Sequence, residues 1–261
     1  MLARRPEGAA PLFSDSLLPS SHPPPWDPWH FMTKRLAWFR IDPYFLVGLV
    51  AVVVAGGVYL RREAPASPRR DVTHFSPAVA QSLDRLGVGY TRGDPDAAVH
   101  VVELFDYQCP ACAAAHRATA PLLDRHLAMG AIRYTVYDLP LPSHGNAIPA
   151  ALVAGCVERQ SSDVFWELRR RFFAEQATWA NAYPAEPPLL RIAHSMGRDT
   201  AAVRACLAAE GPARAVNLRQ SWEVASGAGF TFTPAWSVNG KIVSWDALDR
   251  EISLAMRGSA R

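Results

Sequence analysis

The apolar pattern between residues 98 and 139 predicts a strand, a helix and a second strand. Ala98–Phe105 is almost continuously apolar, as expected of a central strand covered on both faces, and Ile132–Leu139 alternates. Between them, Cys112–Met129 has the pattern of a helix, and Gly130 stands where a helix commonly ends. This order is typical of one half of an α/β domain.

Helical patterns alone occupy the next 80 or so residues, about 145–227. Five helices are expected there, over Ala147–Gln160, Asp163–Glu175, Leu189–Met196, Thr200–Ala209 and Pro212–Ser226. The pattern then returns to two short apolar runs around Asn239-Gly240, the dipeptide most typical of a tight hairpin turn. A helix is expected at each end of the domain, one near residues 77–86 and one near 246–256.

An uncharged stretch at Pro43–Leu60 stands apart from this domain. As a helix it would be about 27 Å long, close to the ~30 Å hydrocarbon core of a bilayer, with Tyr44 and Tyr59 at its two boundaries. We therefore expect one transmembrane anchor over 41–60. A Pro-rich tail over 1–40 precedes it, and a linker with a short helix over 61–92 follows it.

Two alternatives concern this N-terminal part. A cleaved signal peptide would use the small residues Ala64-Pro65-Ala66, but charged residues separate them from the apolar run, which favours an uncleaved anchor. Met32 begins a compact basic segment before the anchor, so translation from Met32 would remove residues 1–31. Basic residues flank the anchor on both sides, and the positive-inside rule therefore does not decide its orientation.

The candidate chemistry lies where the first strand meets the first helix. Cys109 and Cys112 form a C-x-x-C there, and a thiolate at a helix N-terminus is stabilised by unpaired N–H groups and by the helix dipole. Cys109 is therefore the expected nucleophile, and Cys112, one turn later, the resolving thiol. A metal site made of these cysteines and His116 is the alternative. The net charge of +3 on 261 residues gives no nucleic-acid-binding stripe.

The chain resembles the membrane-anchored branch of the DsbA-like thiol:disulfide oxidoreductases. Two segments carry the resemblance, Val102–Cys112 with its C-x-x-C and Thr231–Gly240 with its Thr-Pro before the hairpin. It covers about 93–258 and implies a thioredoxin-like α/β core with an inserted helical subdomain. It also implies that Pro234 is cis and faces the cysteines, so that the backbone of Thr233 can pair with substrate.

The resemblance also assigns roles to three further residues. Glu103, a lone acid in an apolar strand, should have a raised pKa, and the family implies that it relays protons for the buried thiol; a solvent-facing edge position is the alternative. Cys156 and Cys206 lie on two different expected helices. Family members often join such a pair in a structural disulfide, which is the favoured expectation here; two buried free thiols are the alternative. Asp106 and Tyr107 are expected to shape the loop.

The expected function is the introduction of disulfides into exported proteins outside the cytoplasm. The chain would be a single-pass protein of the inner membrane, re-oxidised by a quinone-linked membrane oxidase and free of cofactors and metals. The net direction is open, because Pro110-Ala111 lacks the histidine that stabilises the thiolate in strongly oxidising members. A reductase or isomerase of the same fold is the first alternative, and a metal-delivery module the second.

Overall fold

The computed structural model describes Tyr44, Leu49 and residues 72–259. The chain divides into two compact units, 1–66 and 67–261, and the second contains the folded domain. Apart from Tyr44 and Leu49, the expected tail, the anchor at 41–60 and the first part of the linker lie outside the described residues, as does Met32. Within the described part of the chain, no helix has the length and apolar character needed to cross a membrane.

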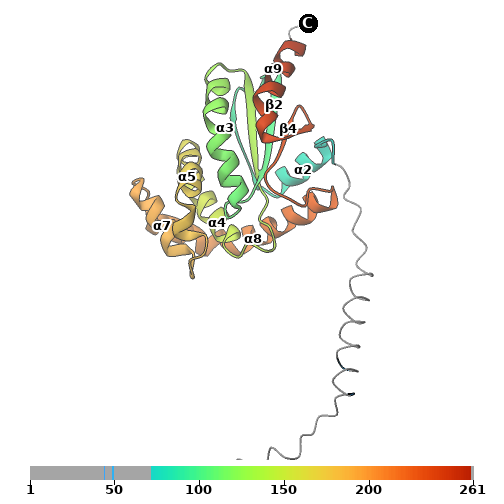
Figure 1. The fold of residues 1–261 in the computed structure, drawn as a ribbon. Coiled ribbons are helices and arrows are strands. Elements are labelled where there is room, and N and C mark those ends of the chain that lie inside the picture. The colour runs from blue at the N-terminus through green and yellow to red at the C-terminus, as the bar shows by residue number, and fades with distance from the viewer. Residues whose placement is uncertain (1–43, 45–48, 50–71, 260–261) are drawn as a thin grey trace, which may run out of the picture. The chain divides into compact units, whose positions relative to one another are not determined.

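A five-stranded sheet of order β1-β3-β2-β4-β5 forms the centre of the domain (Figure 1). The strands are β1 (Gly89–Gly93), β2 (Val99–Phe105), β3 (Ile132–Asp138), β4 (Ala235–Val238) and β5 (Lys241–Val243). Only the β2–β3 pair is parallel, and the other three pairs are antiparallel. The central strand β2 is buried along almost its whole length, as its apolar sequence predicts.

Helices cover both faces of this sheet. On one face lie α3 (Pro110–Ala128), α5 (Ser162–Ala174) and α9 (Leu248–Ser259), the last preceded by a short 3-10 turn, Trp245–Ala247. On the other face α2 (Pro77–Arg85) contacts α8 (Thr200–Gly227). The insert is completed by α4 (Ala147–Glu158), α6 (Gln176–Trp179) and α7 (Glu186–Ser195). This arrangement confirms the expected thioredoxin-like core with a helical insert.

The sequence explains the start and the end of α3. Cys109 is the N-cap residue in extended conformation, and Pro110 occupies the first turn, where its fixed φ suits a helix and its missing N–H costs nothing. Gly130, with φ of 63°, takes the left-handed conformation just after the helix. The helix therefore begins at Pro110, two residues before the expected position, which puts Cys109 at its first turn.

Several expected boundaries were wrong. The strand β1 was not predicted, because Gly-Tyr-Thr-Arg-Gly has glycine at both ends and no apolar run. The two helices expected at 200–209 and 212–226 are the single helix α8, with Pro212 inside it. Packing of buried side chains on both sides of Pro212, Val203 before it and Leu218 after it, outweighs the hydrogen bond that the proline removes.

A disulfide between Cys156 of α4 and Cys206 of α8 closes the insert. Their Cα atoms are 5.8 Å apart, and the two residues are 50 positions apart in the sequence. The bond joins the first helix of the insert to the helix that leads back to the sheet. It therefore ties the end of α4 to the first half of α8.

Candidate active site

The structure brings the C-x-x-C and the Thr-Pro loop together, although they are more than 120 residues apart in the sequence. Cys109 and Cys112 are the free cysteines of the described chain, and both are buried. The Sγ atom of Cys109 lies 3.5 Å from the carbonyl oxygen of Thr233, to which its thiol donates. The Thr233–Pro234 bond is cis. The expected nucleophile and the residues expected to bind the substrate therefore share one site.

Cys109 is set up as a thiolate. Its pKa is lowered to about 5, mainly by a hydrogen bond with the Cys112 side chain, and further by Thr233 and by the backbone N–H groups of Ala111 and Cys112. Burial acts in the opposite direction and is outweighed. The main stabilising group is thus the Cys112 side chain, assisted by the backbone N–H groups of the helix start. The histidine missing between the cysteines is not needed for a low pKa.

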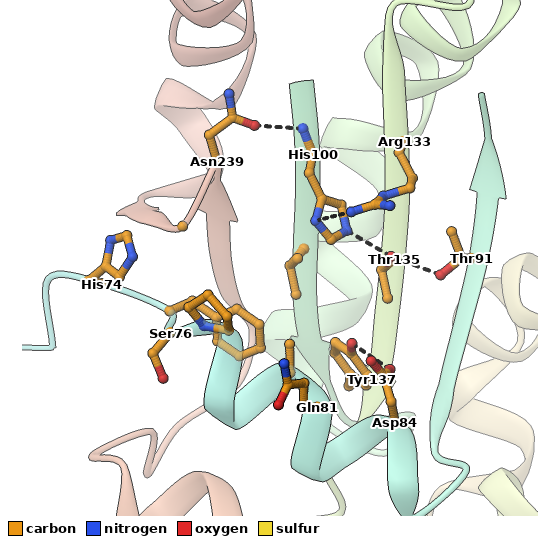
Figure 2. Close-up of a pocket in the computed structure, with 15 residues that line it drawn as sticks. His74, Ser76, Gln81, Asp84, Thr91, His100, Arg133, Thr135, Tyr137 and Asn239 are labelled. Carbon is orange, nitrogen blue, oxygen red and sulfur yellow. Dashed lines mark hydrogen bonds between the residues drawn. The ribbon is translucent and has the colours of Figure 1, made fainter. Parts of the chain in front are cut away.

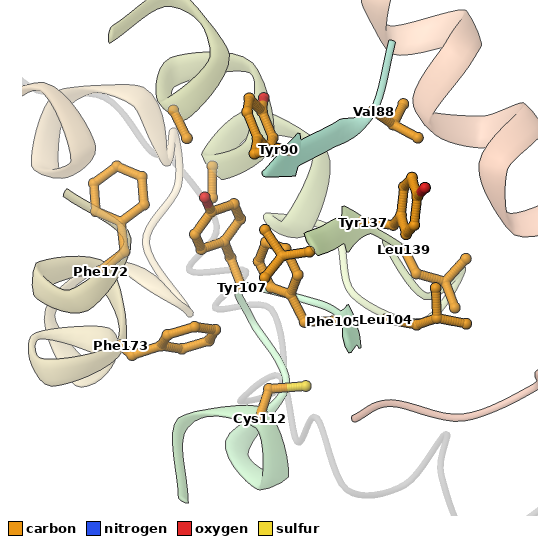
Figure 3. Close-up of a cluster of buried hydrophobic side chains, with 14 of the residues drawn as sticks. Val88, Tyr90, Leu104, Phe105, Tyr107, Cys112, Tyr137, Leu139, Phe172 and Phe173 are labelled. Carbon is orange, nitrogen blue, oxygen red and sulfur yellow. The ribbon is translucent and has the colours of Figure 1, made fainter. Parts of the chain in front are cut away.

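Cys112 has the opposite character. Burial raises its pKa well above the usual value, and the neighbouring Cys109 raises it further. Its side chain lies at the edge of the buried apolar cluster that contains Phe105, Tyr107 and Phe173 (Figure 3). The backbone N–H of Asp106 donates to its Sγ atom at 3.5 Å. Cys112 is therefore a thiol when reduced, whereas Cys109 is a thiolate.

Asp106 organises the loop before the cysteines. Its carboxylate accepts hydrogen bonds from the backbone N–H groups of Gln108 (2.6 Å) and Leu141 (2.8 Å). His144 Nδ1 lies 2.8 Å from the same carboxylate, so His144 also helps to position the loop. Burial raises the pKa of Asp106, while these hydrogen bonds lower it. The expectation that this residue shapes the loop agrees with the geometry.

Polar side chains of the insert hold the same loop from the other side. Gln176 donates to the carbonyl oxygens of Tyr107 (2.8 Å) and Cys109 (3.1 Å). Gln108 donates to the carbonyl of Ala180 at 2.7 Å and accepts from the backbone N–H of Asn146 at 2.6 Å. The insert thus fixes the backbone that presents Cys109.

Glu103 lies on the central strand and is fully buried, which excludes the solvent-facing alternative. Burial raises its pKa, as expected, although neighbouring groups oppose the rise. It is not a lone acid, however: Arg169 of α5 donates to its Oε2 atom at 2.6 Å, and the hydroxyl of Tyr134 also hydrogen-bonds to that oxygen. The pairing of Glu103 with Arg169 was not predicted, because Arg169 belongs to the insert and lies far from Glu103 in the sequence.

His116, the third ligand of the metal alternative, is engaged elsewhere. Its Nδ1 atom accepts a hydrogen bond from Arg169 at 3.0 Å. Burial and nearby arginines lower its pKa to about 3, so the ring is neutral. Among the described residues, no group of three histidine, cysteine or acidic side chains is arranged to hold a metal ion.

A cavity of about 440 Å³ opens on the face of the sheet that carries α2 (Figure 2). Arg133 donates to His100 Nδ1 at 3.1 Å, and His100 Nε2, which then carries the proton, donates to Thr135 at 2.9 Å. Burial, assisted by Arg133, lowers the pKa of His100 to about 4, so its ring is neutral at pH 7. The cysteines do not line this cavity, which is separate from the dithiol site.

Arg169 is the most important site residue that was not predicted, although the sequence contained one signal for it. Arg169 stands in an Arg-Arg-Arg run that reads as solvated charge, yet it lies four positions after Phe165 and three before Phe172. Both phenylalanines are fully buried on α5, and residues at these spacings share a helix face. A cation on an apolar stripe of this kind indicates a buried acidic partner.

The fold and the site together define a thiol:disulfide oxidoreductase with a thioredoxin core. Its C-x-x-C lies at the first turn of the helix that follows the central strand. The chain belongs to the thioredoxin family, whose family model matches residues 86–255.

Solved structures support the same fold. The oxidised form of BdbD from Bacillus subtilis is 20% identical, with a TM-score of 0.56, and the match covers 66% of this chain and 95% of that one. A thioredoxin-like oxidoreductase from Silicibacter pomeroyi is 25% identical, with a TM-score of 0.54 and coverage of 68% and 97%. The alpha-DsbA1 protein of Wolbachia pipientis is 18% identical, with a TM-score of 0.56 and coverage of 66% and 92%.

A curated relative matches part of the chain as well. The Na(+)/H(+) antiporter NhaA 3 of Salinispora tropica is 32% identical over 154 residues. The match covers 58% of this chain and 22% of the antiporter, so the chain spans about a fifth of the length of that relative.

Proposed function

We propose that this protein is a disulfide donor that acts on thiol-containing exported proteins outside the cytoplasm. The observation that carries the proposal is the contrast between the two active-site thiols. Cys109 has a pKa of about 5 and Cys112 one well above the usual range. A stabilised Cys109 thiolate favours the reduced form of the pair, and a pair that favours reduction is a strong oxidant of other thiols.

The reaction follows from this contrast. A substrate thiolate attacks Sγ of Cys109 in the oxidised pair, the Cys109–Cys112 bond breaks, and Cys112 leaves and takes up a proton. A second substrate thiolate then attacks the substrate sulfur of the mixed disulfide. Cys109 leaves as a thiolate, which its low pKa makes a good leaving group. The substrate is oxidised by two electrons, and the Cys109–Cys112 pair is reduced by two.

The proposed location rests on two features. Pro43–Leu60 is long and uncharged enough for a membrane anchor. The Cys156–Cys206 disulfide joins two helices of the insert, away from the active-site cysteines, and structural disulfides of this kind persist mainly in oxidising compartments. We place the protein in the inner membrane with its catalytic domain outside the cytoplasm, re-oxidised there by a quinone-linked thiol oxidase.

A labelling experiment tests this location. Spheroplasts that contain the full chain are reduced briefly and treated with a maleimide that cannot cross membranes. Cys109 is expected to be modified without permeabilisation, and a Cys109→Ser chain, treated in the same way, should lose that label. Modification of Cys109 only after permeabilisation would place the site in the cytoplasm and contradict the proposal.

A further inference from the structure

The cavity on the α2 face of the sheet contains a cation that has no acidic partner. Arg133 lies on β3, and one of its Nη atoms donates to His100 Nδ1 at 3.1 Å (Figure 2). In the part of the chain that the structure describes, Arg133 makes no other hydrogen bond and no ion pair. A guanidinium group has five N–H donors, so most of those of Arg133 remain available to a ligand.

His100 holds this guanidinium in place without adding a charge of its own. Burial and the nearby Arg133 lower the pKa of His100 to about 4, so its ring is neutral at pH 7. Its Nε2 atom donates to the Thr135 hydroxyl, which is in turn hydrogen-bonded to the Thr91 hydroxyl at 2.8 Å. This chain of hydrogen bonds crosses three strands of the sheet. Arg133 is therefore pre-organised, and its planar fork matches the two oxygens of a carboxylate.

Apolar side chains line the same cavity beside the cation. Phe75 and Val102 are almost completely buried, and Ala80 of α2 packs against the core next to them. Sites for small molecules typically have volumes of roughly 300–1,000 Å³ and combine apolar walls with a few fixed polar groups. The cavity, at about 440 Å³, falls in this range. It can therefore cover the apolar body of a small ligand as well as pair with its charge.

Asp84 of α2 limits the charge that this ligand can carry. Its Oδ1 atom accepts a hydrogen bond from the Tyr137 hydroxyl at 2.7 Å, at the end of the cavity away from Arg133 (Figure 2). Arg133 and Tyr137 are four residues apart on β3, which is about 13 Å along a strand. A negative group at Arg133 is therefore distant from Asp84, whereas a second negative group at the far end of the ligand would be repelled.

We propose that this cavity binds a small organic monocarboxylate. The carboxylate accepts hydrogen bonds from Arg133, and the apolar body of the ligand lies against Phe75, Ala80 and Val102. The cysteines do not line the cavity, so this binding site is independent of the proposed disulfide chemistry.

Hexanoate is the probe for the test, and its uncharged analogue hexanamide is the matched control. The full chain is held in nanodiscs of phosphatidylcholine, and saturation transfer from the protein to the ligand protons is measured at increasing ligand concentration. We expect saturable binding of hexanoate. Hexanamide should bind about tenfold to 100-fold more weakly, the range expected for loss of a hydrogen bond to a charged group. Equal binding of the two probes by the native chain would overturn the proposal, whether or not any variant folds.

Variants of two residues locate the binding. Arg133→Met should weaken hexanoate binding by the same factor, and Arg133→Lys, which keeps the charge without the fork, should weaken it less. Arg117→Met removes an exposed cation of α3, on the other face of the sheet, and should bind as the native chain does. Ala80→Trp fills the cavity and should abolish binding, whereas Ala78→Trp places the same side chain on the exposed side of α2.

Adipate tests the role of Asp84, because it has the length of hexanoate and a second carboxylate. It should bind more weakly than hexanoate to the native chain, and Asp84→Asn should reduce this difference. No saturable binding of hexanoate, native affinity in Arg133→Met, or tighter binding of adipate than of hexanoate by the native chain would each contradict a monocarboxylate site.

Discussion

Replacing Cys109 by serine is expected to reduce thiol:disulfide exchange to the uncatalysed rate. Cys109 is the thiol with the lowered pKa and the one beside the Thr233–Pro234 loop, whereas burial raises the pKa of Cys112 and keeps it protonated. No other free thiol is found among the described residues. The measurement is the rate at which the oxidised full chain forms disulfides in a reduced, unfolded substrate protein.

Replacing Cys112 by serine should have a different result. The first attack still occurs at Cys109, but the resolving thiol is absent, so mixed disulfides between Cys109 and substrate proteins should accumulate. Recovered from cells, these conjugates identify the substrates, and we expect exported proteins. Conjugates in the Cys109→Ser chain, with none in the Cys112→Ser chain, would reverse the assigned roles.

Removing the Cys156–Cys206 disulfide should cause the largest loss of stability. For a loop of 50 residues, the chain-entropy model gives about 4 kcal/mol. We expect the Cys156→Ala, Cys206→Ala chain to unfold at lower urea concentration, with a free energy of unfolding lower by about this amount. Its insert also carries Gln176 and Arg169, so disorder there would reach the active-site loop.

The matched control for this prediction removes the other pair. A Cys109→Ser, Cys112→Ser chain lacks the active-site thiols but keeps the disulfide of the insert. It is compared with the native protein in which only the Cys109–Cys112 pair is reduced. It should retain most of the urea resistance. If the insert variant unfolds at the same urea concentration as the native chain, the bond contributes little to stability and the expected role is wrong.

Local sequence patterns predicted the fold well where structure is decided locally. The hairpin at Asn239-Gly240 has positive φ at both residues, 46° and 84°, as its turn type requires. The central strand could be predicted because β2 is buried on both faces and its sequence is therefore almost continuously apolar. Prediction was wrong where tertiary packing decides, in the unbroken helix α8 and in the short edge strand β1.

The same division applies to the site. Cys109 and Cys112 are adjacent on one helix turn, so their chemistry could be inferred from spacing. Arg169 lies 66 residues after Glu103, and only the packing of α5 against the sheet brings the two together. The lowered pKa of Cys109 was predicted from the helix start, whereas the contributions of Cys112 and of the distant Thr233 depend on the folded structure.

The reduction potential of the Cys109–Cys112 pair tests the central claim most directly. The detergent-solubilised full chain, with Cys156–Cys206 intact, is equilibrated against glutathione at pH 7, and the oxidised fraction is measured. The stabilised Cys109 thiolate predicts a potential near the oxidising end of the family, about −120 mV. A value near that of thioredoxin, about −270 mV, would contradict a disulfide donor and make the protein a reductase.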